Sequence, residues 1–263
     1  MGNQNRKLFF LIALPRSGNT LFASIMNQNP EVACTANSVT LEIIKNLYLI
    51  KTTDTFQNFP DHKSLDNILD NVYNLYYKDW PQRIIIDRGP VMLSGNPGNF
   101  ELMQKHFKPG FKCIILLRDL MDVFASYIKW YTENPDSFVN KLGKTDEEKI
   151  LALMDKQGGI VKELNAIQNA FKNPSICHFV KYDDIVTNPE QEFKKIYQFL
   201  DEPYFNHGFD NLDQVEVNGL SYDDTIMGSN MHKLFDGPVR KMYNPYIEKI
   251  PKNIKERYGH IKI

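Results

Sequence analysis

The chain has 263 residues, of which 42% are hydrophobic and 24% are charged. This composition is typical of a folded globular protein and excludes the disordered and collagen-like classes. The 31 Lys and Arg residues nearly balance 32 Asp and Glu, which leaves a formal net charge of -1. The chain therefore lacks the overall positive charge of proteins that bind nucleic acid or anionic membranes, and we expect neither partner.

The sequence also argues against a membrane span, a disulfide framework and a zinc site. No apolar run reaches the roughly 18 residues that a spanning helix requires. The cysteines Cys34, Cys113 and Cys177 are far apart and form no C-x-x-C motif, so we expect buried free thiols and no metal. The apolar run from Leu8 to Leu14 does not end in a cleavage site, and we expect a cytoplasmic protein.

The first elements expected along the chain are a strand, a helix and a second strand. Residues 8–14 are all apolar, as in a strand that is buried on both faces. Residues 20–29 carry Leu21, Phe22, Ile25 and Met26 at the spacing of one helix face. Residues 31–35 are expected to form a short second strand.

The middle of the chain continues this alternation. Helices are expected at 38–50 and 64–79, the second with Ser64 as its N-cap. Strands are expected at 83–87 and 112–117, followed by a helix at 119–131. Short apolar runs that alternate with amphipathic stretches predict an α/β fold, with a central, mainly parallel sheet flanked by helices.

The last regular elements lie before residue 201. The capping box Thr145–Glu148 predicts a helix from 145 to about 171, which the pair Gly158–Gly159 is expected to break or kink. A strand is expected at 175–181, and a helix at 189–200 begins at Pro189. We expect one domain over 1–263, with a ligand-binding α/β core at 1–200 and a loop-rich region at 201–263 that closes the site.

The segment Ala13-Leu14-Pro15-Arg16-Ser17-Gly18-Asn19-Thr20 joins the first strand to the first helix. The N–H groups of a first helical turn have no partners within the helix, and together with the helix dipole they bind anions. Gly18 allows close backbone approach, Arg16 adds a planar cation, and Ser17 and Thr20 add hydroxyl donors. The segment is therefore predicted to bind phosphate.

This segment differs from the ATP-binding pattern G-x-x-x-x-G-K-[ST]. Ala13 occupies the position of the first Gly, and Asn19 that of the Lys. A small-molecule kinase of the P-loop class needs that lysine and a carboxylate for magnesium. Asp87 is available as the carboxylate, so a kinase is an alternative that the missing lysine weakens.

A second motif follows the fourth expected strand. Arg118 lies at the carboxyl end of that strand, where open α/β sheets bind their ligands. Ser126 lies two helical turns further on, so that one small anion can contact both side chains.

These motifs resemble those of sulfotransferases that use 3'-phosphoadenosine 5'-phosphosulfate (PAPS). The run Leu14–Leu21 is similar to the family's 5'-phosphosulfate loop, and Arg118–Ser126 is similar to its 3'-phosphate motif. A third match, Val180–Pro189, resembles the strand-to-helix segment Y-E-D-L-x-x-x-P. The resemblance covers residues 8–200 and is strongest to the tyrosylprotein-type and bacterial Pro-Arg-Ser-Gly enzymes. The cytosolic steroid and phenol enzymes have a lysine where this chain has Arg16.

The resemblance implies a P-loop NTPase-like sulfotransferase fold and a set of nucleotide-binding residues. Arg118 and Ser126 would bind the 3'-phosphate, and Tyr182 would lie near the nucleotide. In the C-terminal region Lys233, Arg240 or Lys241 would contact phosphate. The 5'-phosphosulfate would be bound by Arg16, Ser17, Gly18, Asn19, Thr20 and Leu21. The product would be adenosine 3',5'-bisphosphate (PAP), and no metal is implied.

The resemblance also suggests a residue for the chemical step. The family often has a lysine in an x-K-x-P setting, and Arg88 before Gly89-Pro90 matches it. A cation there stabilises the charge that develops on the leaving phosphate. Arginine stays protonated, however, so Arg88 is not expected to donate a proton.

The general base is expected to be a carboxylate or a histidine. The position at which the tyrosylprotein enzymes have a glutamate corresponds to Asn37, which cannot accept the proton. Our candidates are Glu42 first, Asp87 second and His232 third.

The predicted function is transfer of a sulfuryl group from PAPS to a hydroxyl of a small-molecule, saccharide or peptide acceptor, by in-line displacement. Because Asn37 replaces the glutamate, a non-catalytic nucleotide-binding relative is a further alternative. The sequence does not identify the acceptor or the oligomeric state.

Overall fold

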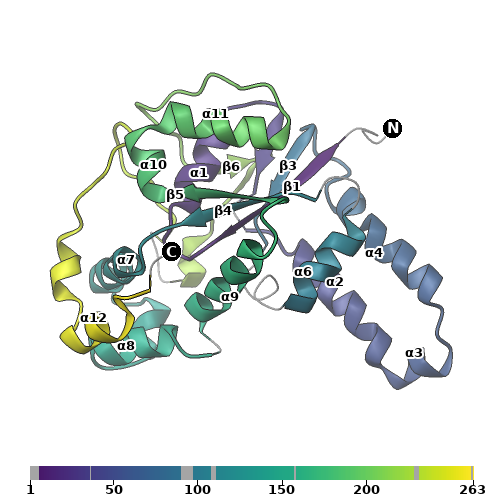
Figure 1. The fold of residues 1–263 in the computed structure, drawn as a ribbon, viewed down its shortest axis with the longest axis horizontal. Coiled ribbons are helices and arrows are strands. Elements are labelled where there is room, and N and C mark those ends of the chain that lie inside the picture. Colours follow the sequence, from purple (N-terminus) through teal and green to yellow (C-terminus); the bar gives the residue numbers. More distant parts are fainter. Residues whose placement is uncertain are drawn as a thin grey trace.

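A computed structural model describes residues 6–35, 37–89, 97–107, 111–156, 158–227, 231–261 and 263. Five parallel strands form its central sheet, in the order β2-β3-β1-β4-β5 (Figure 1). In chain order these strands are β1 (Lys7–Ala13), β2 (Val32–Cys34), β3 (Ile84–Asp87), β4 (Cys113–Leu117) and β5 (Cys177–Lys181). The expected α/β class and parallel sheet are confirmed, and each expected strand lies within two residues of its predicted bounds.

Helices join the strands and cover both faces of the sheet (Figure 1). They are α1 (Asn19–Met26), α2 (Thr40–Leu49), α3 (Asp54–Asn58), α4 (His62–Tyr76), α6 (Pro97–His106), α7 (Leu120–Glu133), α8 (Asp146–Leu153), α9 (Gly159–Phe171), α10 (Tyr182–Thr187), α11 (Pro189–Leu200) and α12 (Lys252–Tyr258). Short 3-10 helices occupy η1 (Ile50–Thr52), η2 (Phe138–Lys141), η3 (Asp224–Met227) and η4 (Pro245–Lys249).

Aromatic side chains fill the layers between sheet and helices. Phe22 of α1 stacks on Phe193 of α11, with ring centroids 5.6 Å apart. Phe10 of β1 meets Tyr73 of α4 edge-on at 5.6 Å and Phe107 at 5.1 Å. Burial of each of these side chains stabilises the fold by about 2 kcal/mol. These contacts therefore hold the strands and helices, and the loops between them, in fixed positions.

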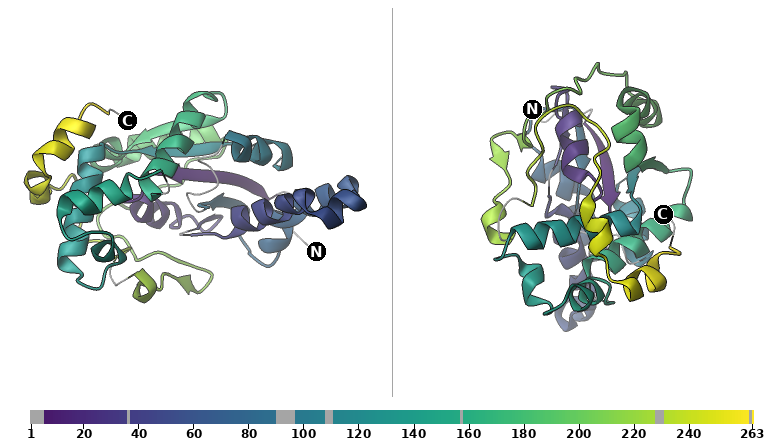
Figure 2. Two further views of the ribbon diagram at one scale, coloured as in Figure 1. Left: turned by 90° about the horizontal axis from the view of Figure 1, so that it is seen from below. Right: turned by 90° about the vertical axis from the view of Figure 1, so that its left-hand side faces the viewer.

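Helices α2, α3 and α4 form an arm that extends away from the sheet (Figures 1 and 2). The N-cap of α4 is Asp61, whose carboxylate accepts a hydrogen bond of 3.0 Å from the Ser64 amide. The sequence-based choice of Ser64 as N-cap was therefore wrong. Asp61 is the more favourable cap because its charge also faces the positive end of the helix dipole.

The helix expected over 145–171 is divided into α8 and α9. The capping box of Thr145 and Glu148 is present at the start of α8, as predicted. At Gly158 the chain passes so close to α8 that a Cβ atom would lie 2.2 Å from the Leu153 carbonyl oxygen. The glycine pair therefore breaks the helix, because no side chain fits at this turn.

Some short elements have no counterpart in the sequence-based expectation. These are α3, α10 and the antiparallel hairpin of β6 (Glu216–Val217) and β7 (Leu220–Ser221). Helix α6 was also missed, although Phe100, Met103 and Phe107 have the spacing of one helix face. In the described ranges no helix is long and apolar enough to cross a bilayer. The three cysteines are free and buried, as expected.

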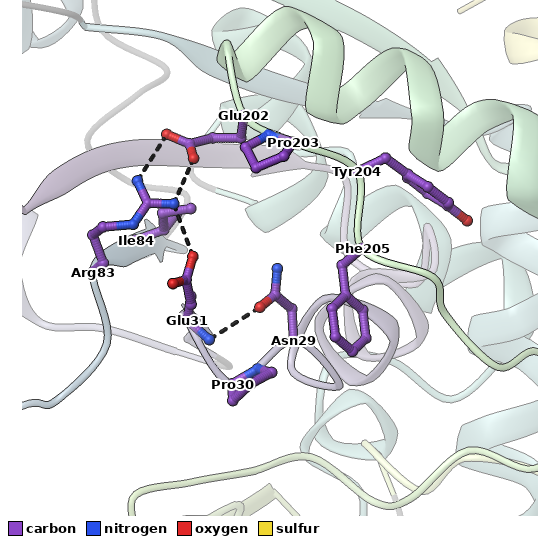
Figure 3. A pocket seen from close by; sticks show the side chains of 9 residues that line it. All are labelled: Asn29, Pro30, Glu31, Arg83, Ile84, Glu202, Pro203, Tyr204 and Phe205. Carbon is purple, nitrogen blue, oxygen red and sulfur yellow. Dashed lines mark hydrogen bonds and ion pairs between the residues drawn. The ribbon is translucent and has the colours of Figure 1, made fainter.

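A buried carboxylate joins three segments at the edge of the sheet opposite to the carboxyl ends of its strands. Glu202, which follows α11, has a side chain only 2% exposed and lies 2.6 Å from Lys7 Nζ. Arg83 donates to its two oxygens at 3.2 Å and 2.7 Å and also contacts Glu31 at 2.9 Å (Figure 3). The ion pairs tie the starts of β1 and β3 to the end of α11.

Removal of this carboxylate is expected to destabilise the fold. Loss of one partner from a buried ion pair costs several kcal/mol, but Lys7 and Arg83 are partly exposed, so Glu202→Ala should lower the free energy of unfolding by about 2 kcal/mol. Urea unfolding measures this change. In the control Glu190→Ala, which removes an exposed pair with Lys194, the loss should stay below about 0.5 kcal/mol. Equal losses in both variants would contradict the prediction.

The effect of Glu202→Ala should also depend on pH. Burial alone would raise the pKa of Glu202, but hydrogen bonds from Arg83 and Lys7 outweigh it and the pKa lies below its usual value. A carboxyl with a lowered pKa stabilises the fold above its unfolded-state pKa and loses this effect as the pH falls through the folded-state pKa. Wild type and Glu202→Ala should therefore converge in stability in acid.

Candidate active site

A cavity of about 610 Å³ lies beyond the carboxyl ends of the strands. Arg16 follows β1, Arg88 follows β3, Arg118 follows β4 and Tyr182 follows β5, and all four line this cavity. These strands are consecutive neighbours in the sheet and run parallel, so the residues that follow them meet at one edge. Residues 231–246 of the C-terminal region line the other side of the cavity.

The loop between β1 and α1 is held in an unusual conformation. Arg16 and Gly18 both have positive φ, at 65° and 92°. The Leu14 carbonyl accepts hydrogen bonds from the Ser17 hydroxyl and, at 3.2 Å, from the side-chain amide of Asn19. A Cβ atom at Gly18 would lie 2.7 Å from the Tyr182 ring, so only glycine fits here.

The same loop presents backbone donors at the start of α1. The first hydrogen bond of the helix runs from the Phe22 amide to the Gly18 carbonyl at 2.9 Å. The amides of Asn19, Thr20 and Leu21 precede it, so they have no acceptor within the helix. These amides and the positive end of the helix dipole make the loop an anion site.

The two motifs singled out in the sequence are in direct contact. Arg118 donates from Nη1 to the Arg16 carbonyl at 2.6 Å. Arg16 donates from Nε to the Ser126 hydroxyl at 3.1 Å, and its Nη1 donates to the Met231 carbonyl. The guanidinium of Arg118 lies over the Tyr182 ring, 4.1 Å from its centroid. A single ligand can therefore contact both motifs.

The charges around the cavity favour an anionic ligand. Its cationic side chains are Arg16, Arg88, Arg118, Lys129, Lys233 and Arg240, and Glu133 is the only carboxylate among the lining residues that the structure describes. Burial lowers the pKa of Arg16, and the nearby Arg118 adds to this effect. Arg118 Nε is buried and has no hydrogen-bond partner in the described part of the chain. A bound anion would relieve the repulsion and satisfy this donor.

His232 lines the cavity from the C-terminal side, beside an aspartate. Its Nδ1 lies 2.5 Å from Asp224 Oδ1, and its backbone amide donates to Asp224 Oδ2 at 2.9 Å. The ring stacks on Tyr222 with centroids 3.7 Å apart. Burial lowers the pKa of His232 below 6.5, although the hydrogen bond to Asp224 opposes this shift. The lowered pKa favours the neutral imidazole, and the hydrogen bond to Asp224 orients its ring.

The structure brings most of the predicted site residues together. Those that line the cavity are Arg16, Gly18, Asn19, Thr20, Leu21, Arg88, Arg118, Ser126, Tyr182, His232 and Lys233. Ser17, Asp87 and Glu42 do not line it. Ser17 is buried and donates within its own loop. Asp87 is buried behind Arg88, and the Glu42 side chain is exposed on α2. Pro90 of the predicted x-K-x-P match lies outside the described residues.

Sequence reasoning missed two groups of lining residues. Lys129, Trp130 and Glu133 follow Ser126 at i+3, i+4 and i+7 on α7, a helical spacing that could have identified them. The second group, which includes Phe235, Met242 and Tyr243, lies in an irregular segment without periodicity. Only the packing of this segment beside α7 reveals its place at the cavity.

Comparison with known proteins supports one family. Residues 9–206 match the model of the sulfotransferase family. A Caenorhabditis briggsae protein that carries a protein-tyrosine sulfotransferase name is 26% identical over 204 residues, which are 75% of this chain and 66% of the relative. Protein-tyrosine sulfotransferase A of Caenorhabditis elegans is 22% identical over 211 residues, which are 77% of this chain and 52% of that relative. The chain thus spans between about half and two thirds of the length of these relatives.

A solved structure shows the same fold. The sulfotransferase domain from the olefin synthase of Synechococcus PCC 7002 superposes with a TM-score of 0.55 at 14% identity, over 88% of this chain and 86% of that domain. The family match covers the five-stranded sheet and both anion-binding motifs. The chain therefore belongs to the sulfotransferase family, as its motifs predict.

Proposed function

We propose that this chain transfers a sulfuryl group from PAPS to a hydroxyl acceptor. The observation that carries this proposal is the contact between its two anion-binding motifs within one cavity of about 610 Å³. A ligand with phosphate groups at two ends fits such a site better than a single small anion does. Membership in the sulfotransferase family supports the same activity.

The residues at the cavity fit the chemistry of a doubly phosphorylated nucleotide. The amides of Asn19, Thr20 and Leu21 and the Arg16 guanidinium suit a 5'-phosphosulfate. Ser126 and Arg118, whose Nε has no partner among the described residues, suit a 3'-phosphate. Apolar side chains of Val186 and Leu212 line the same cavity and can contact a base.

PAPS would supply the sulfuryl group and its leaving phosphate. Arg88 would contact the transferred sulfuryl group at its bridging oxygen, and its fixed charge would act most strongly as negative charge develops on the leaving phosphate. His232, neutral and oriented by Asp224, would accept the proton of the acceptor hydroxyl at Nε2. The geometry favours His232 over Glu42 and Asp87, because only His232 lines the cavity.

A kinase fits the site less well. Asn19 stands at the position of the lysine of the ATP-binding pattern, and its side-chain amide donates to the Leu14 carbonyl. Asp87, the carboxylate available for magnesium, does not line the cavity.

The acceptor that we propose is the phenolic hydroxyl of a tyrosine in a peptide. The names of the nematode relatives support this class. The cavity also has an open aromatic rim, in which Phe235 is 65% exposed and Tyr243 is 74% exposed. Exposed aromatic side chains at a cavity suit an extended ligand that leaves part of itself outside.

We expect Arg16→Ala and Arg118→Ala each to weaken PAP binding by about tenfold or more, because each removes charge-assisted hydrogen bonds to phosphate. Isothermal titration calorimetry with PAP measures this loss. Arg257→Ala, on the outer helix α12, is the matched control and should bind PAP as the wild type does. Unchanged affinity in both cavity variants would refute the assignment.

Gly18→Ala should also impair PAP binding, because its Cβ would displace the Tyr182 ring on which Arg118 rests. Gly219→Ala is its control, since Gly219 also has a positive φ, at 79°, but has no atom within 4 Å of an added Cβ. Both variants should lose some stability through backbone strain. Only Gly18→Ala should lose PAP affinity in the titration, and equal affinities would contradict the role of the loop.

The role of His232 predicts a pH profile. Since a protonated imidazole cannot accept the proton and burial lowers the His232 pKa, the acid limb of kcat/KM should have its midpoint below the ordinary histidine value of 6.5. Asp224→Asn removes the charge that raises this pKa, so the acid limb should move to lower pH, and kcat should drop about tenfold or more. PAP release from PAPS with a panel of tyrosine-containing peptides is the assay.

Glu42→Gln is the companion variant in that assay. It should keep the wild-type rate and pH profile if His232 is the base, whereas a large loss in Glu42→Gln alone would reinstate Glu42. PAP binding without turnover on any acceptor would favour the non-catalytic alternative.

A further inference from the structure

The turn formed by Asp87, Arg88 and Gly89 is held on several sides by residues outside the cavity. The Arg88 amide donates to Thr35 Oγ1 at 2.8 Å, and its carbonyl accepts from the Ser38 amide at 2.9 Å. Both backbone groups of Arg88 are thus bonded to the segment that leads into α2. The direction in which the Arg88 side chain leaves the backbone is set by these bonds.

Asp87 anchors the same turn from the interior. Its side chain is 0% exposed. Its Oδ2 accepts hydrogen bonds from the Tyr77 hydroxyl at 2.5 Å and from Thr40 Oγ1 at 2.7 Å. Ser38 Oγ lies 2.8 Å from Thr40 Oγ1 and accepts from Tyr77 at 3.2 Å. We call Ser38, Thr40, Tyr77 and Asp87 the Asp87 network.

The network connects the end of β3 to the base of the helical arm. Thr40 is the first residue of α2, and Tyr77 directly follows α4. Gly89 closes the turn against α2, because a Cβ there would lie 2.2 Å from Leu41 Cδ1. Asp87, the Arg88 backbone and Gly89 are thus all fixed by the arm and the segment before it, while the Arg88 side chain lines the cavity.

A buried carboxylate is expensive unless hydrogen bonds satisfy it, and apolar residues could fill the same space at equal or better stability. Stability alone therefore does not account for Asp87. Its position directly before Arg88, which lines the cavity, points instead to a role at the site. Burial raises the pKa of Asp87, which the hydroxyl donors oppose. A carboxyl so enclosed is shielded from any acceptor hydroxyl.

We propose that the Asp87 network is a positioning device for Arg88, so that Asp87 acts through Arg88 and is no general base. This inference rests on the proposed function, in which Arg88 acts on the transferred group. The inference also gives the helical arm a role at the site, because Thr40 at the start of α2 and Tyr77 after α4 hold the turn that carries Arg88.

Equilibrium binding tests the inference without an acceptor. PAPS and PAP differ by the sulfuryl group, so their affinity ratio reports on contacts to that group. Arg88→Ala should lower the PAPS-to-PAP affinity ratio by about tenfold through loss of a charge-assisted contact. Thr40→Val and Tyr77→Phe should lower it by about threefold or more, since small displacements of a positioned group are costly. Calorimetry with each nucleotide measures both affinities.

Matched variants separate positioning from general loss of structure. Thr40→Ser keeps the hydroxyl and should retain the wild-type ratio. Tyr197→Phe removes a buried hydroxyl of α11 whose partners are Asn29 and His207, neither of them in the Asp87 network, and should also leave the ratio unchanged. Thermal unfolding of every variant identifies any that fails to fold. If Thr40→Val does not fold, Tyr77→Phe takes its place in the comparison.

The double variant Arg88→Ala/Thr40→Val decides the question. If Thr40 acts through Arg88, the double variant should have the ratio of Arg88→Ala alone. Additive losses, or an unchanged ratio in both Thr40→Val and Tyr77→Phe, would overturn the inference while leaving the proposed function intact. Wild-type protein that binds neither nucleotide would instead refute the proposed function, and an unchanged ratio in Arg88→Ala would refute the role of Arg88.

Discussion

The parallel register of β3, β1, β4 and β5 is the constraint on which the site depends. Each strand ends at the same edge of the sheet, and residues within three positions of each strand end line a common cavity. Arg88, Arg16 and Arg118 are distant in sequence, yet the register places them side by side. A chain with a net charge of -1 thereby concentrates positive charge at one point of its surface.

Placing several positive charges close together costs free energy through burial and repulsion, and a bound anion can offset this cost. Burial and the proximity of Arg118 both disfavour the charged form of Arg16, whose backbone also adopts a positive φ. Hydrogen bonds to Ser126, Met231 and the Arg16 carbonyl hold this arrangement in place. The loop is therefore preorganised, so that an incoming anion has little reorganisation to drive, which is the condition for strong electrostatic stabilisation.

Two parts of the chain line the cavity. The α/β core supplies the anion-binding loop, Arg118 and Arg88, all attached to the sheet. The C-terminal region supplies His232 with Asp224, together with the exposed aromatic rim. The helical arm contributes indirectly, because the Asp87 network joins its base to the turn that carries Arg88. Segments far apart in the chain therefore contribute charged and titratable side chains to one cavity.

The sequence by itself determined the class of fold, the strands, the two anion-binding motifs and the family. These features are local, since a buried strand, a glycine turn and a helix start each leave a pattern within a few residues. Tertiary structure alone decided the rest. It placed Glu42 and Asp87 outside the cavity lining, His232 beside Asp224, and the Ser17 hydroxyl on the Leu14 carbonyl. Such outcomes depend on contacts between residues far apart in the chain, and spacing along the sequence cannot specify which side chains share a cavity.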